Sequence, residues 1–184
     1  SSGHCRCPAC LQRVPAELNF LGRADYSDLY YGWCNRVIDG VLKKHPDKWF
    51  GCLAYSEVAS PPKNVKVHER LIPYMTYDRM KWIHPEVEAA GHAATEAWER
   101  ASPTLGWYDY IYGRPYQLPR VWFHHMADYY RFGRDNSVRA LYADLDSRHE
   151  FSLTQPRYSA ELLTHLRELW LGTGNLTPEQ IRSQ

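Results

Sequence analysis

Short apolar runs alternate with amphipathic segments along this chain, and this alternation constrains its fold more than any other feature. Nearly continuous apolar runs of this length are typical of strands that are buried on both faces of a parallel sheet. We expect four such strands, at residues 49–55, 71–77, 106–112 and 137–143. Apolar residues at helical spacing predict three helices between or beside them, at residues 27–45, 86–101 and 120–132.

Two further segments refine this pattern. The paired prolines in residues 60–64 exclude a helix there, so a loop is expected to connect the first two strands. Leucines spaced along the chain after Ser159 predict another amphipathic helix, and Thr177 with Pro178 is typical of the start of one more.

The order of strands and helices predicts an α/β fold with a parallel sheet. A complete (β/α)8 barrel needs roughly 250 residues, whereas this chain has 184. We therefore expect a partial (β/α) TIM-type barrel, with residues 1–184 as a single domain that forms the C-terminal part of a larger barrel and residues 1–24 as a cysteine-containing loop segment. Exposed strand edges would then be covered by the missing barrel half or by a second copy in a homodimer.

Composition excludes several classes of partner. The chain has 22 basic and 21 acidic residues, so no strong field favours nucleic acid. We find no apolar run of the roughly 20 residues that a membrane-spanning helix requires, and no signal peptide in the first residues, so an export signal would have been removed or lie upstream. Neither a Gly-rich phosphate loop nor a Gly-x-Ser-x-Gly nucleophile motif occurs.

Aromatic and acidic residues gather where the expected strands end. The chain contains 14 Tyr and 7 Trp, whose flat faces and polar tips suit sugar-binding clefts. Candidate sugar-binding residues are Tyr55, Tyr77, Arg79, Trp107, Tyr110 and Tyr112, and candidate catalytic carboxyl groups are Glu57, Asp78, Asp109 and Asp144. Cleavage of a glycosidic bond needs two carboxyl groups, and ligands of barrels bind at the carboxyl ends of the strands.

The carboxyl groups also have structural interpretations. An acidic residue at a strand end can cap the next helix, Asp78 with Arg79 could form an ion pair, and Asp109 could point into or out of the barrel. Glu57 fits a cap least well because a proline-containing loop follows it. We therefore expect Glu57 as the general acid/base of a glycoside hydrolase, with Asp78, Asp109 or Asp144 as its partner. A non-catalytic glycan-binding module and a zinc-stabilised scaffold are the alternatives.

Three of the five cysteines lie within six positions of one another. Cys5, Cys7 and Cys10, with His4 beside them, could hold a structural Zn²⁺. The fourth ligand could instead be a distant or an upstream residue. A disulfide with one spare thiol, or free cysteines, would also fit this spacing. Cys34 and Cys52 are expected in the apolar core.

Three segments carry a resemblance to a known family: GHCRCPAC, the stretch from SDLYYGWCNRVIDG to LAYSEVASPPKNVKVHERL, and WYDYIYGRPYQLPR. Together they resemble an uncharacterised glycoside-hydrolase-like family of polysaccharide-degrading bacteria, whose barrel is similar to that of α-glucuronidases and hexosaminidases. The resemblance covers residues 3–146. It implies a secreted or periplasmic protein that acts on glycans, with a barrel that begins before residue 1.

Overall fold

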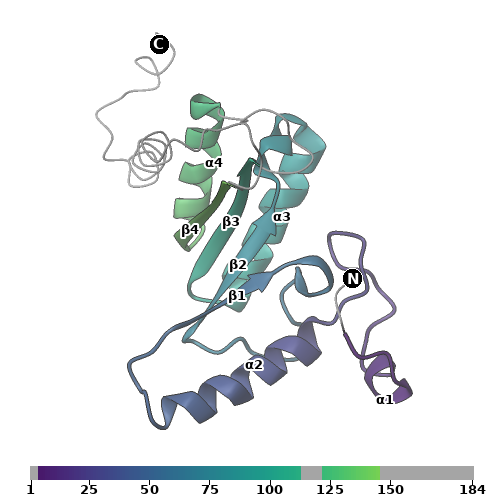
Figure 1. Cartoon of the computed structure of the whole chain (residues 1–184). Coiled ribbons are helices and arrows are strands. Elements are labelled where there is room, and N and C mark those ends of the chain that lie inside the picture. Colours follow the sequence, from purple (N-terminus) through teal and green to yellow (C-terminus); the bar gives the residue numbers. More distant parts are fainter. Residues whose placement is uncertain (1–3, 113–121, 146–184) are drawn as a thin grey trace.

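The computed structural model describes residues 4–112 and 122–145, which form a four-stranded parallel sheet with helices packed against it (Figure 1). The strands are β1 (Phe50–Ala54), β2 (Leu71–Tyr77), β3 (Leu105–Tyr112) and β4 (Val138–Leu145), in that spatial order. The helices are α1 (Pro8–Leu11), α2 (Ser27–Leu42), α3 (Pro85–Ala101) and α4 (Phe123–Asp135), with short 3₁₀ helices η1 (Ser56–Val58) and η2 (Arg79–Ile83). The prediction of an α/β fold with four parallel strands is confirmed.

One hydrophobic core lies between the sheet and its three long helices. Tyr31 of α2, Trp98 of α3 and Tyr130 of α4 belong to the same buried cluster as Leu71 and Trp107 of the sheet. A strand order that follows the chain, with each new strand added on the same side, places successive crossover segments on one face of a sheet. None of the helices in the described residues combines the length and the apolar character needed to cross a membrane.

The opposite face of the sheet, called the open face below, carries exposed side chains. It carries Leu53 of β1, whose Cα partner is Tyr74 of β2, and Tyr108 of β3, whose Cα partner is Tyr142 of β4. Tyr74 is in turn the Cα partner of Gly106 in β3. Leu53 is 47% exposed and Tyr142 is 53% exposed. The expectation that β1 is buried on both faces is therefore wrong, because the described helices cover only one of its faces.

Two glycines determine how Tyr74 lies on the open face. A Cβ atom on Gly106 would lie 2.6 Å from the Tyr74 ring, and one on Gly51 would lie 3.1 Å from it. The ring therefore occupies the space that side chains on these two neighbouring strands would fill. Beside it, Tyr108 stacks on Tyr142 with ring centroids 4.7 Å apart. These aromatic rings border a shallow hollow of about 370 Å³.

Element boundaries differ from the expectations in a few places. The helix expected at residues 120–132 begins at Phe123 and continues to Asp135, and the fourth strand extends to Leu145. The segment expected as a loop around the cysteines contains one helical turn, α1, with Pro8 at its first position, where proline suits a helix. The loop expected at residues 60–64 is confirmed. The helices expected after Ser159 and at Thr177 lie outside the described residues.

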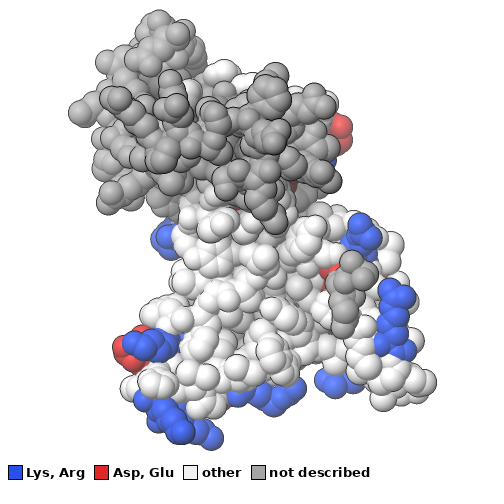
Figure 2. All heavy atoms as spheres, in the orientation of Figure 1, with Lys and Arg blue, Asp and Glu red and all other residues white. Residues whose placement is uncertain are grey.

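Charged side chains do not gather over the centre of the molecule. On the face drawn in Figure 2, the Lys and Arg side chains of the described residues lie in separate small groups, mostly around the lower rim, and the white central area carries no charge. The described part of this face therefore shows no concentrated positive patch of the kind that binds a polyanion.

The glycines give the first testable prediction. Gly106→Ala should lower the free energy of unfolding by about 1–3 kcal/mol, because the new methyl group overlaps the Tyr74 ring. Gly40→Ala is the matched control: this glycine lies in α2 with open space around it, so alanine should raise the helix's stability by roughly 0.5–1 kcal/mol. Urea unfolding of both variants measures the difference. Equal stability of Gly106→Ala and the wild type would contradict the close packing of Tyr74.

Candidate functional site

Several of the candidate residues lie at or just beyond the carboxyl ends of the strands. Ala54 pairs with Met75, Met75 with Trp107, and Trp107 with Leu141. We call the residues three positions after these four along the chain the edge row. They are Glu57, Asp78, Tyr110 and Asp144. Tyr110 and Asp144 are themselves Cα partners. Glu57 lies in η1 and Asp78 directly follows β2, so with Asp144 of β4 three of the four predicted carboxyl residues lie at or just beyond the carboxyl ends of strands in this sheet.

The segment that carries Glu57 is fixed by a hydrogen bond at every carbonyl from Ser56 to Ser60. The donors are Asn19 Nδ2 to Ser56 (2.6 Å), Tyr26 N to Glu57 (2.8 Å), Tyr31 Oη to Val58 (3.1 Å), Trp98 Nε1 to Ala59 (2.8 Å) and Ser27 Oγ to Ser60 (2.7 Å). Because the donors come from α2, α3 and the segment before α2, this turn is held from three directions. Such support is what a binding group needs to keep its geometry.

Backbone strain marks the same turn. Ser56 has a φ of 55°, in the left-handed region that non-glycine residues rarely adopt. Residues held in such a conformation cluster at functional sites, where the surrounding structure overcomes a cost of order 1–3 kcal/mol. Ser56 stands between Tyr55, which is half exposed, and Glu57. The strained residue thus sets the direction in which the chain leaves β1.

Asn19 supports this turn and was not a candidate from sequence. Its Oδ1 accepts hydrogen bonds from the backbone N–H groups of Leu21 and Arg23, both at 3.0 Å. Its Nδ2 donates to Ser56, 37 residues away. Asparagine three positions before Gly22 is a recognisable turn signal. Nothing in that local signal connects it to the end of β1.

The remaining candidates at this edge have distinct surroundings. Glu57 and Tyr77 are half buried, and Asp78 Oδ2 lies 3.8 Å from Lys81 Nζ. Burial raises the pKa of Tyr77. Phe20, which the sequence did not single out, packs against Tyr77 with ring centroids 5.7 Å apart.

Asp109 lies on the other face of β3, in the interior beneath α4. Its Oδ2 accepts hydrogen bonds from Tyr129 Oη (2.9 Å) and Tyr130 Oη (3.2 Å), and its Oδ1 lies 3.7 Å from Arg79 Nη1. Both charged side chains are fully buried. Burial raises the pKa of Asp109 and lowers the pKa of Arg79, while their mutual attraction opposes both shifts. The sequence suggested an ion pair between Asp78 and Arg79. In the structure, Arg79 forms a buried ion pair with Asp109.

Arg79 and Trp107 form part of the same internal cluster. Arg79 donates hydrogen bonds to the carbonyl groups of Met75 (3.0 Å), Tyr77 (3.2 Å) and Tyr108 (3.3 Å). Its guanidinium carbon lies 3.9 Å from the centroid of the Trp107 ring. Both side chains are buried, so in this structure these two candidate sugar-binding residues face the core and not the carboxyl edge.

The last two aromatic candidates lie at the end of β3. Tyr110 shares a face with Tyr108, with ring centroids 5.4 Å apart, and belongs to the edge row. Tyr112 is the last residue of β3. The side chains of Tyr112 and Asp144 lie outside the described part of the structure, which places only the backbone of these two residues.

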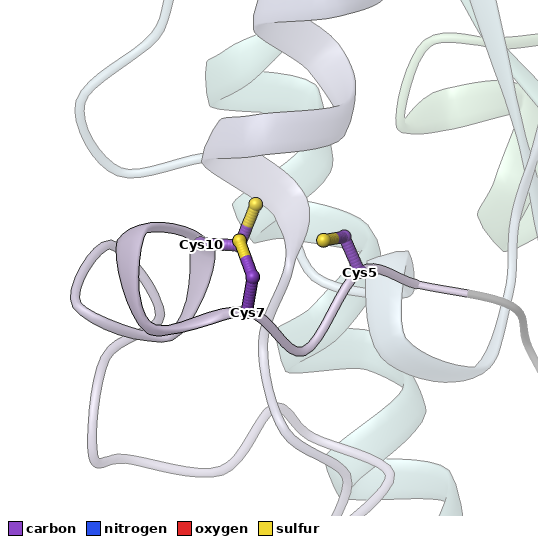
Figure 3. A group of neighbouring side chains, drawn as sticks. All are labelled: Cys5, Cys7 and Cys10. Carbon is purple, nitrogen blue, oxygen red and sulfur yellow. The ribbon is translucent and has the colours of Figure 1, made fainter.

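A second candidate site lies in the N-terminal segment. The sulfur atoms of Cys5, Cys7 and Cys10 all lie within 4.8 Å of one another (Figure 3). This cluster could hold a metal ion. His4 does not join it in the structure, because its ring stacks on Tyr26 with centroids 4.6 Å apart.

Hydrogen bonding differentiates the three thiols. Hydrogen bonding lowers the pKa of the Cys7 thiol. The groups responsible are the backbone N–H of Cys10 and the thiols of Cys5 and Cys10. The same contact with Cys7 raises the pKa of Cys10 to about 11. Cys34, by contrast, is buried between α2 and the sheet, as expected for a core cysteine, and Cys52 is half buried beside it.

Comparison with known proteins identifies a family. Residues 1–165 match the family described as Domain of unknown function (DUF4838), so this chain belongs to the DUF4838 family. A search of curated proteins found no match, and a search of solved structures found none. The family description specifies no activity, and the relation to α-glucuronidases and hexosaminidases stays a prediction.

The buried ion pair gives the second prediction. Asp109→Asn should lower the free energy of unfolding by about 3–5 kcal/mol, because it leaves the Arg79 charge buried without a counter-charge. Asp128→Asn serves as the control, since Asp128 forms an exposed ion pair with Arg131 that should contribute at most about 1 kcal/mol. Denaturant unfolding compares the two. Equal effects would show that the internal pair does not hold the fold together.

Proposed function

We propose that this member of the DUF4838 family binds glycans at the carboxyl edge of its sheet and cleaves glycosidic bonds with Glu57 and Asp78. The observation that supports the proposal is the turn after β1, in which five consecutive carbonyl groups around Glu57 accept hydrogen bonds. β1 pairs with β2, which Asp78 directly follows. A catalytic carboxyl group needs such fixed support, because a small displacement lowers the rate strongly.

The two carboxyl groups would divide the chemistry. Glu57 would act as the general acid that protonates the leaving oxygen, and Asp78 as the nucleophile or as the base that activates water. Asp144 shares the edge row and is the alternative partner. We leave Asp109 out of the pair, because its carboxylate is fully buried and already accepts two tyrosine hydroxyl groups.

Aromatic side chains at the same edge would bind the sugar. Tyr55 is half exposed, immediately before the strained Ser56, and Tyr77 and Tyr110 follow on the next two strands. Their faces can pack on sugar rings while their hydroxyl groups reach polar neighbours. The near balance of 22 basic and 21 acidic residues agrees with a neutral ligand better than with a polyanion such as nucleic acid.

We propose further that the sheet belongs to a (β/α)8 barrel. A strand order that follows the chain and helices that share one core support this, because both features are typical of such barrels. The open face would then line the barrel interior, and either another part of the barrel or a second copy of the chain would cover it. Secretion or export to the periplasm, implied by the family resemblance, is part of the same proposal.

A zinc-stabilised scaffold without glycan chemistry is the second candidate. The convergence of Cys5, Cys7 and Cys10 favours it, because structural zinc sites stabilise small segments that bury little apolar surface. The two candidates differ in what they predict at the carboxyl edge, since a scaffold requires neither Glu57 nor Tyr55 to contact a ligand.

Glycan binding and hydrolysis by the full chain test the proposal. Glu57→Gln should lower kcat by about 10²–10⁴-fold and leave binding intact, because it removes the proton donor alone. Tyr55→Ala should weaken binding by roughly 3–10-fold, the loss expected for one aromatic contact. Trp49→Ala is the matched control, because Trp49 is equally exposed but lies before β1, at the opposite end of the strand.

Each outcome separates the candidates. If Glu57→Gln leaves hydrolysis unchanged while Tyr110→Ala abolishes binding, the catalytic assignment of Glu57 is overturned. If the wild type binds glycans and hydrolyses none of them, the site is a non-catalytic glycan-binding module. If no member of a broad panel of plant, algal and animal glycans binds, the glycan proposal is overturned and the scaffold remains.

A further inference from the structure

The three cysteine sulfurs carry an inference that is independent of the glycan proposal. We propose that Cys5, Cys7 and Cys10 bind one divalent zinc-like cation through three thiolates, and that an exogenous ligand such as water, and not His4, occupies the fourth coordination position. The site would therefore be an open metal centre in the exposed N-terminal segment.

The spacing of the sulfur atoms already approaches a metal site. Zn–S bonds of about 2.3 Å in a tetrahedral site place the sulfur atoms about 3.8 Å apart. All three sulfur atoms of the cluster lie within 4.8 Å of one another. Closing the remaining gap requires movement of at most about an ångström, which side-chain rotation in an exposed segment can supply.

The backbone around Cys7 holds two of the cysteines on one turn. The carbonyl of Cys7 accepts hydrogen bonds from the N–H groups of Cys10 and Leu11, both at 3.0 Å, and this closes the turn of α1. The turn thus brings Cys7 and Cys10 to one side with no metal required to form it.

The side chain of His4 is engaged elsewhere. Its ring lies 4.6 Å from that of Tyr26 and nearly parallel to it, at 18°. Tyr26 is itself buried at the start of α2, so His4 would have to leave this stack to reach the sulfurs. Within residues 4–112 and 122–145, no further His, Asp or Glu side chain joins the group of three. Cys5 and Cys7 are exposed, which leaves room for a small ligand.

Cobalt substitution tests both the ligand count and the open position. Co²⁺ added to the reduced full-length chain should bind one ion per chain and give thiolate-to-cobalt charge-transfer absorption of the strength expected for three thiolates. Cyanide or imidazole should then shift the visible d–d bands, because it enters the fourth position. Zinc should displace cobalt with loss of the absorption.

Variants separate the possible ligands. Cys7→Ser should weaken the charge-transfer absorption by about a third or abolish binding, whereas His4→Ala should leave the spectrum unchanged. Cys34→Ala is the matched control, because it removes a thiol that lies in the core. Circular dichroism confirms that each variant is folded.

Four results would overturn the inference. Absence of cobalt binding, or recovery of the chain with a disulfide within the cluster that persists in reductant, would exclude the metal site itself. A spectrum altered by His4→Ala would assign the fourth position to His4. Bands that do not respond to cyanide or imidazole would show that the protein fills that position. None of these outcomes depends on glycan binding.

Discussion

The buried contact between Arg79 and the strand ends is the interaction on which the rest of the structure depends. A guanidinium with no exposed surface must find partners inside the protein, and Arg79 finds them in carbonyl groups of both β2 and β3, in Asp109 and in the face of Trp107. The carbonyl of Arg79 also lies 3.3 Å from His125 Nε2 on α4. Arg79 thus joins two strands to a helix through its side chain and its backbone carbonyl, and it follows directly after Asp78 in the chain.

The two supports of the carboxyl edge differ in kind. Beside β2, Asp78 directly precedes Arg79, whose buried ion pair with Asp109 cannot lose a partner without a large loss of stability. Beside β1, Glu57 is placed by neutral hydrogen bonds from separate elements to successive carbonyl groups, and no single one of them determines the turn. The surroundings of Glu57 and of Asp78 are therefore held by separate sets of contacts. A substitution that removes one set is not expected to displace the other residue.

Sequence patterns predicted the elements well and the directions of side chains poorly. Apolar runs identified all four strands because strand burial leaves a local signal. The sequence could not predict which face of the sheet Asp109 lies on. Side chains alternate between the two faces of a strand, and only the register with neighbouring strands shows which set is buried. Asn19 and Ser56 are linked across 37 residues, and the stack of His4 on Tyr26 across 22, by contacts that no short motif encodes. Burial of β1 was overestimated because an apolar run does not reveal which face the helices cover.

The position of Tyr74 over Gly51 and Gly106 has a consequence for whatever covers the open face. A tyrosine on a bare sheet normally samples several rotamers, and a partner that binds it must immobilise it at a cost in entropy. Here the glycines of the flanking strands leave a slot for the ring, so Tyr74 loses its rotamer freedom when the chain folds. An element that covers the open face would therefore meet a surface of fixed shape. It must match that shape, because the surface will not adapt to it.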